Sequence, residues 1–168
     1  MPNPCIFSAD RRYRYTLVHQ WDELLNPGHG IAWICLNPST ADEHQLDPTL
    51  TRIRDFSAAW GYAYFVMLNL FAWRATDPAA MKRVDDPTGA ENDHWIRHWA
   101  ARCDRVVLGW GEHGAHRGRD REVLAYLDPA KLFCLERNAS GQPKHPLYVA
   151  KRTPLKAFSA SPGLPMAS

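Results

Sequence analysis

Polar side chains gather in the motif Asn-Pro-Ser-Thr-Ala-Asp, which begins at Asn37 and directly follows an apolar run. The amide of Asn37 can both donate and accept hydrogen bonds. The hydroxyls of Ser39 and Thr40 can bind a phosphate or cap the next helix. Asp42, or Asp47 further along, can position or activate a water molecule. The same residue types also suit a turn stabilised by side-chain hydrogen bonds to the backbone, and both interpretations stay open.

A second group of residues combines an amide with aromatic rings. Asn69 ends another apolar run, with Phe71 and Trp73 directly behind it, and Trp110 follows a third run. A buried amide needs hydrogen-bond partners, so Asn69 either ties two loops together or reads the edge of a ligand. The three aromatic rings can stack on a planar ligand if they border a cleft, or they belong to the core.

The third candidate is the segment Lys-His-Pro-Leu-Tyr, which places His145 in a proline turn between Lys144 and Tyr148. A histidine in such a position can stabilise a leaving anion by donating a hydrogen bond.

The elements that must position these residues follow from the apolar pattern. Continuous apolar runs predict four strands buried on both faces, at Ile31–Leu36, Ala63–Leu70, Arg105–Leu108 and Lys131–Leu135. Helical spacing predicts helices at 49–60, 92–103 and 117–127, a helical turn from Asp77 and a short helix at 149–158. Residues 10–18 alternate in polarity and predict an edge strand.

Strands that alternate with helices predict an α/β fold, here a three-layer α/β/α sandwich around a central, mostly parallel four-stranded sheet. In such sheets ligands bind at the carboxyl ends of the strands, where the three polar groups above are expected to meet.

Length and composition are those of one folded domain. The chain has 168 residues, of which 45% are apolar and 23% charged, so a disordered, collagen-like or coiled-coil protein is excluded. We expect a single domain at 1–158 and a flexible tail at 159–168. The apolar runs are too short for a membrane helix and the N-terminus lacks a signal-peptide pattern, so we expect a cytoplasmic monomer without a membrane partner.

Charge and cysteine spacing bear on partners and cofactors. Arginine outnumbers lysine fifteen to five, and from residue 137 onward there are five basic residues and no acid. This distribution suits a polyanion such as DNA, although charge alone favours a solvated surface with a basic tail. Candidates for contacts with the DNA backbone are Thr40, Arg117, Lys144, Tyr148, Lys151 and Arg152. The four cysteines are widely spaced, so we expect neither a metal site nor a cofactor.

Taken in order, the motifs resemble an uncharacterised bacterial and phage family of unknown function. The resemblance covers roughly residues 10–158 and rests on Leu-Asn-Pro-Ser-Thr-Ala-Asp and His-Pro-Leu-Tyr. More widely, the pattern resembles the uracil-DNA glycosylase superfamily, whose mismatch-specific branch has an Asn-Pro pair like Asn37-Pro38.

The wider resemblance implies a DNA glycosylase that flips a uracil, a damaged base or a modified base out of the helix and leaves an abasic site. It implies that Asn37 positions the attacking water, with Asp42 as a candidate base, and that His145 stabilises the leaving base. Base contacts are implied for Pro38, Ser39, Asn69, Phe71, Trp73 and Trp110. Repair of DNA and defence against phage both fit this activity.

Departures from the superfamily keep other functions open. No aspartate stands next to Pro38, and Leu147 replaces a serine that is common after the histidine. The alternatives are a non-catalytic module that binds nucleic acid or nucleotides on the same fold, and a hydrolase or transferase that acts on free nucleosides or nucleotides.

Overall fold

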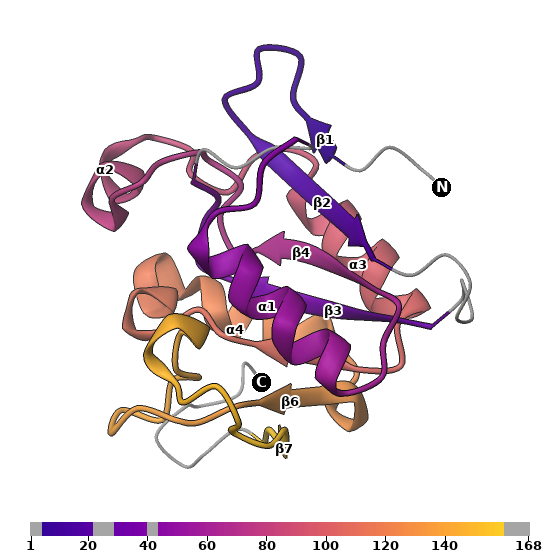
Figure 1. Cartoon of the computed structure of the whole chain (residues 1–168). Coiled ribbons are helices and arrows are strands. Elements are labelled where there is room, and N and C mark those ends of the chain that lie inside the picture. Colours follow the sequence, from indigo (N-terminus) through magenta and orange to yellow (C-terminus); the bar gives the residue numbers. More distant parts are fainter. Residues whose placement is uncertain (1–4, 22–28, 40–43, 160–168) are drawn as a thin grey trace.

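A seven-stranded sheet forms the centre of the molecule in a computed structural model that describes residues 5–21, 29–39 and 44–159 (Figure 1). The strands lie side by side in the order β1-β2-β4-β3-β5-β6-β7. Their bounds are β1 (Cys5–Phe7), β2 (Arg14–Gln20), β3 (Gly30–Cys35), β4 (Tyr64–Asn69), β5 (Val106–Leu108), β6 (Leu132–Cys134) and β7 (Lys156–Ala157).

The four predicted apolar runs form β3, β4, β5 and β6, which run parallel to one another. Antiparallel strands extend this group on both sides, because β1 and β2 add next to β4 and β7 adds next to β6. The mixed α/β class is therefore confirmed. The prediction of four mostly parallel strands is corrected to seven strands, with as many antiparallel as parallel neighbours.

Two local predictions at the sheet edges were wrong. The segment predicted as an edge strand forms β2, which β1 covers on its outer side. The segment 149–158 forms no helix and ends in β7 instead. Pro154 lies in the middle of that segment and cannot donate the hydrogen bond that a helix interior needs.

Four helices connect the strands: α1 (Pro48–Ala59), α2 (Pro78–Arg83), α3 (Asn92–Arg102) and α4 (Arg119–Tyr126). Three short 3-10 segments complete the connections, η1 (Glu112–Gly118), η2 (Pro129–Lys131) and η3 (Pro146–Tyr148). The carboxylates of Asp47 and Asp77 cap α1 and α2, each with a proline at the start of its helix. None of the helices in the described ranges is long and apolar enough to span a bilayer.

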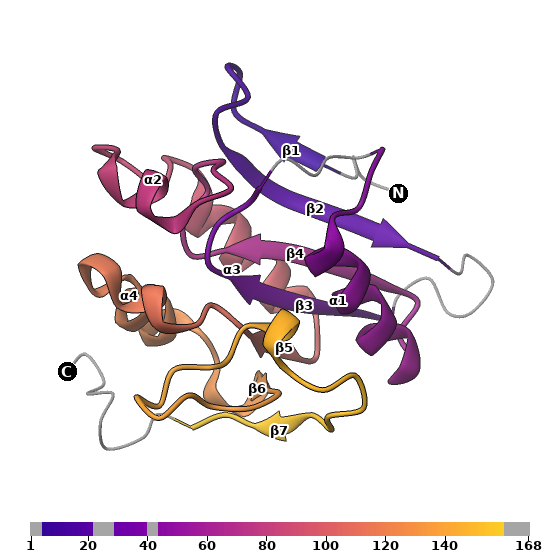
Figure 2. The same ribbon diagram turned by 60° about the vertical axis from the view of Figure 1, so that its left-hand side comes forward.

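Helices cover both faces of the sheet (Figure 2). On one face Ile53 and Phe56 of α1 pack with Ile31 and Trp33 of β3. On the other face α3 and α4 pack against the alternate residues of β3 and β4, with Ile96 among them. The strands β3 and β4 are buried on both sides, which explains the continuous apolar runs that predicted them.

The strands that follow β3 in the sequence are placed on both of its edges, β4 on one edge and β5 on the other. After β3 the chain passes through α1 to β4, whereas β5 pairs with the opposite edge of β3. The loops that follow β3 and β5 therefore diverge, and the space between them is where an open α/β sheet binds its ligand.

The carboxyl end of β4 is held by two side chains from the helical layer. Asn92, which is fully buried, donates from Nδ2 to the main-chain oxygens of Asn69 at 2.9 Å and Leu70 at 3.0 Å. The buried Arg119 donates from Nε to the same oxygen of Leu70 at 2.8 Å and forms an ion pair with Asp93. These contacts satisfy the carbonyl groups that lie beyond the sheet and fix the direction of the next loop.

We expect Asn92→Leu to lower the free energy of unfolding by about 1–3 kcal/mol, because the carbonyl of Asn69 loses its side-chain donor in a buried position. Urea unfolding of wild type and variant measures the difference. The control is His94→Ala on the exposed side of the same helix, for which a change within about 0.5 kcal/mol is expected. Equal stability of Asn92→Leu and wild type would contradict the role given to this amide.

Candidate functional site

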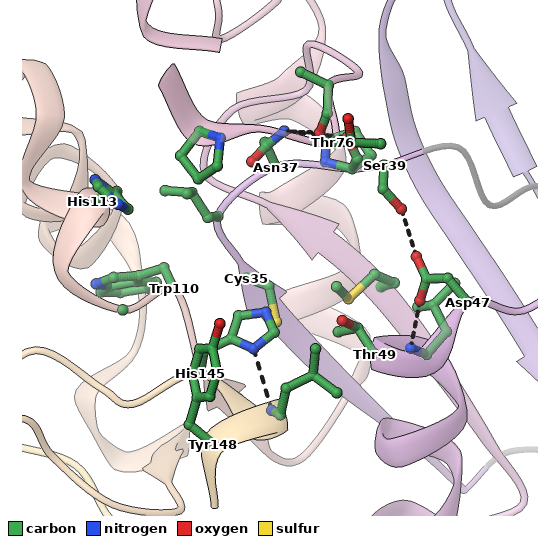
Figure 3. Close-up of a pocket in the computed structure, with 18 of the residues that line it drawn as sticks. Cys35, Asn37, Ser39, Asp47, Thr49, Thr76, Trp110, His113, His145 and Tyr148 are labelled. Carbon is green, nitrogen blue, oxygen red and sulfur yellow. Dashed lines mark hydrogen bonds between the residues drawn. The ribbon is translucent and has the colours of Figure 1, made fainter. Parts of the chain in front are cut away.

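A pocket of about 510 Å³ opens at the carboxyl ends of β3 and β5 (Figure 3). It is lined by residues 35–39 at the end of β3, the start of α1, residues 75–78 after β4, residues 110–113 after β5 and parts of the segment 138–148. We call it the strand-end pocket. Its size lies within the range for sites that enclose a small ligand or one nucleotide unit.

Many of the predicted site residues line this pocket. They are Asn37, Pro38, Ser39, Trp110, Lys144, His145 and Tyr148. Residues from three segments far apart in the sequence thus meet at one place, because the strands that precede them are parallel or end at the same edge. Thr40 and Asp42 lie outside the described residues, so their predicted roles stay predictions.

Three residues predicted to contact a base lie elsewhere. Asn69 and Phe71 are 1% and 0% exposed and do not line the pocket. Trp73 packs its ring edge-on against Tyr13, with centroids 5.4 Å apart, and also lies off the pocket wall. Phe71 and Trp73 pack in or against the core, whereas the buried side-chain amide of Asn69 has no hydrogen-bond partner among the described residues.

Of the described residues predicted to contact a DNA backbone, some border the pocket and others lie away from it. Arg117 donates to the main-chain oxygens of Val84 at 3.0 Å and Asp85 at 2.7 Å, so it joins η1 to the end of α2 and does not line the pocket. Lys151 and Arg152 are exposed and lie beyond the pocket lining. Lys144 and Tyr148 do border the pocket, and Tyr148 is 75% exposed at its rim.

The amide of Asn37 is held in one orientation. Its Nδ2 donates to the main-chain oxygens of Ala75 at 2.8 Å and Pro38 at 3.2 Å. Since both partners can only accept, the atom facing them must be the nitrogen. The carbonyl oxygen Oδ1 then faces away from these partners, where it can accept a hydrogen bond from a molecule in the pocket (Figure 3).

The imidazole of His145 is also held in one tautomer. The backbone N–H of Leu147 donates to Nδ1 at 3.2 Å, which requires an unprotonated Nδ1. Burial lowers the pKa of His145 below its ordinary value of 6.5, although the carboxylate of Asp47 acts in the opposite direction. At neutral pH the ring is therefore uncharged, and Nε2–H is its hydrogen-bond donor.

Asp47 serves two structural partners at the pocket. One carboxylate oxygen accepts from the backbone N–H of Leu50 at 2.8 Å, which caps α1. The other accepts from the hydroxyl of Ser39 at 2.6 Å, so Ser39 holds the loop after β3 against the helix. The helix cap is therefore Asp47 and not Ser39, whereas the predicted contacts of Ser39 with a phosphate or a base stay predictions.

The aromatic wall of the pocket comes from Trp110. The residue is 1% exposed, because its ring packs on Gly114, where an added Cβ would lie 2.0 Å from Cδ1 of the indole. Its Nε1 donates to Gln142 at 2.8 Å, and Gln142 donates in turn to the buried carboxylate of Asp120 at 3.0 Å. This chain of hydrogen bonds fixes the plane of the ring.

Sequence reasoning missed several polar residues of the lining. Arg14 lies at the start of β2, lines the pocket and is 2% exposed. The alternating polarity of this segment did not show which of its arginines is buried. His113 contacts Lys82, with Nδ1 and Nζ 2.7 Å apart. Glu112 and Asn138 follow β5 and β6, and their place in two of the expected strand-end loops was the available signal. No group of three metal-ligating side chains forms within the ranges that the structure describes.

Comparison with known proteins gives one family match, which covers residues 14–147. Searches of curated proteins and of solved structures return no match to the chain. The matched region spans β2 through η3 and includes most of the strand-end pocket. The chain therefore belongs to the family described as "Protein of unknown function (DUF1643)".

Proposed function

We propose that the protein is a DNA glycosylase, which hydrolyses the N-glycosidic bond of a base flipped into the strand-end pocket and leaves an abasic site. The observation that carries the proposal is the pairing of Asn37 and His145 on opposite sides of the pocket, each held in one orientation by the backbone (Figure 3). One offers an acceptor and the other a neutral donor.

Hydrolysis of an N-glycosidic bond needs an acceptor such as Asn37 for the water and a donor such as His145 for the leaving base. Breaking the bond between C1′ and the base nitrogen leaves positive charge on the sugar and negative charge on the base. The Oδ1 atom of Asn37 accepts a hydrogen bond from water and directs its oxygen to C1′. The Nε2–H of His145 donates to the leaving base and stabilises its charge. The water hydroxyl ends on C1′ and the remaining proton on the base.

The rest of the pocket supports a base as the ligand. Trp110 is 1% exposed and contributes only an apolar part of the pocket wall, so the aromatic ring with a free face for stacking is that of Tyr148. A base is out of reach while it is stacked in a duplex, so it must rotate into the pocket. Tyr148 stands exposed at the rim, where it can contact the strand, and Lys144 adds a cation that is paired with Glu136 at 3.6 Å.

Removal of either group is expected to slow base release strongly. We expect Asn37→Ala and His145→Ala each to lower the rate about 100- to 1,000-fold, the usual effect of losing one group that stabilises the transition state. The assay incubates purified protein with single-stranded and duplex DNA that carries uracil, mismatched thymine, hypoxanthine, alkylated bases or modified cytosines. Abasic product is measured by alkaline cleavage.

His94→Ala is the matched control, because this histidine lies exposed on α3 and does not line the pocket. It should retain the wild-type rate. Abasic product at the same rate from wild type and both pocket variants would overturn the assignment of roles. No product on any substrate, together with salt-sensitive DNA binding, would favour a binding module on this fold.

The charge of His145 gives a separate prediction on pH. Its pKa is lowered, so activity should be constant near neutrality and fall only below pH 6.5, where protonation removes the acceptor for the N–H of Leu147. Asp47→Asn keeps the helix cap, because asparagine caps as well as aspartate. It removes the charge that favours protonation, and so the pKa of His145 should fall further and the acid limb should move to lower pH.

An NMR titration of the histidine rings measures this shift directly. The pKa of His98 is also lowered by burial, but its further causes are Arg102 and His94, so it should not respond to Asp47→Asn. A pKa of His145 that rises or stays constant in the variant would contradict the coupling between these two residues.

A further inference from the structure

We infer that the strand-end pocket selects a base that carries an exocyclic amino group, as cytosine- and adenine-type bases do, and that Glu112 and Asn138 are the residues that select it. The inference names the substrate class of the proposed glycosylase and rests on that proposal for its reaction. It concerns Glu112 in the loop after β5 and Asn138 in the loop after β6, two pocket-lining side chains that have no role in the proposed hydrolysis.

Glu112 presents a fixed acceptor to the pocket. The hydroxyl of Ser140 donates to its carboxylate, with oxygen distances of 2.7 and 2.8 Å. A hydroxyl has one proton, whereas a carboxylate has about four acceptor positions, so Glu112 retains most of its capacity to accept. Within the described residues, its carboxylate forms no ion pair with a lysine or arginine that would use this capacity.

The backbone before Glu112 determines where the carboxylate lies. Gly111 has φ 70° and ψ −165°, a conformation that is accessible essentially only to glycine. Its N–H donates to the oxygen of Pro143 at 2.8 Å, which joins the loop after β5 to the loop after β6. Glu112 therefore follows Trp110 at a sharp turn and lines the pocket beside the aromatic wall.

Asn138 lies on a small rigid hairpin, residues 136–144. Backbone hydrogen bonds connect Lys144 to Glu136 and Asn138 to Gln142, each at 2.9 Å, and Gln142 is anchored through Trp110 and Asp120. In the described part of the chain, the side-chain amide of Asn138 makes no hydrogen bond, although it lines the pocket. A half-buried amide on a rigid support is suited to reading the edge of a ligand.

The two side chains together are complementary to one kind of base edge. An exocyclic amino group donates to the carboxylate of Glu112, and the neighbouring ring nitrogen accepts from the amide nitrogen of Asn138. Carboxylates accept from the amino group of cytosine, and asparagine pairs with adjacent donor and acceptor groups, in known base readout. A carbonyl in place of the amino group would face the carboxylate with no proton between them, so uracil and hypoxanthine are disfavoured.

Matched nucleosides test the inference without any chemistry. Deoxycytidine and deoxyuridine differ at the amino position, as do deoxyadenosine and deoxyinosine. Calorimetric titration should show at least about tenfold tighter binding of the amino member of one pair. Glu112→Gln, whose amide can turn its nitrogen toward a carbonyl, should reduce that ratio to near one or reverse it. Asn138→Ala should weaken binding of the preferred nucleoside about tenfold.

Asp55→Asn is the control of equal charge change, because Asp55 is exposed on α1 and pairs with Arg54 away from the pocket. It should leave the ratio unchanged. Equal binding within both pairs, preference for the carbonyl members, absence of binding by all four nucleosides, or a ratio that Glu112→Gln does not alter would each overturn the inference.

The outcome is separable from that of the proposed hydrolysis. Preference for amino-bearing nucleosides without abasic product in the DNA assay would support the inferred recognition and contradict the proposed glycosylase reaction. Abasic product made best from uracil or hypoxanthine would support the reaction and overturn the recognition. Product made best from a cytosine- or adenine-type base, and lost in Glu112→Gln, would support both.

Discussion

The amide of Asn37 bridges the loops that follow β3 and β4, and the shape of the strand-end pocket depends on that bridge. Its nitrogen donates to the oxygen of Ala75, while the N–H of Ala75 donates back to the oxygen of Pro38. Backbone groups beyond a strand end have lost their ladder partners and must be satisfied in another way. The bridge does this for both loops at once, and it leaves the carbonyl oxygen of Asn37 as the group available to a ligand.

The two other walls are built on the same principle, that a buried polar group is fixed by the partners it needs. Asp120, Gln142 and Trp110 form a chain that begins at a buried carboxylate and ends at the aromatic wall. His145 is fixed by the N–H of Leu147. A side chain whose one polar end is occupied by the backbone can offer only its other end to a ligand, which gives a rigid pattern of donors and acceptors.

The pocket combines an uncharged histidine, His145, with a charged carboxylate, Glu112. The neutral His145 avoids the cost of burying an imidazolium, and in the proposed reaction it donates to the leaving base. Glu112 carries its charge in the pocket lining two residues after Trp110, at an exposed position. A ligand with both an anionic leaving site and a donor edge would match this arrangement, and a nucleobase is a ligand of that kind.

Local sequence was sufficient for the four parallel strands, for the four α-helices of the described residues and for part of the site. Continuous apolar runs predicted β3, β4, β5 and β6, because strands buried on both faces need no polar alternation. The position of Asn37 directly after such a run placed it at the pocket. The strands β1 and β7 were not predicted, because they are short edge strands that are held by pairing with a single neighbour.

Tertiary structure alone decided which strand-end residues face the pocket. Asn69 and Asn37 both follow buried strands, yet the chain after β4 turns into the core and the chain after β3 does not. Likewise Glu112 and Asn138 line one pocket, where the N–H of Gly111 donates to the oxygen of Pro143 and joins their two loops. The sequence by itself determined the residue types, the four parallel strands, the helices that connect them and their order along the chain. The direction of each loop was decided by hydrogen bonds between residues far apart in the chain, which no local pattern encodes.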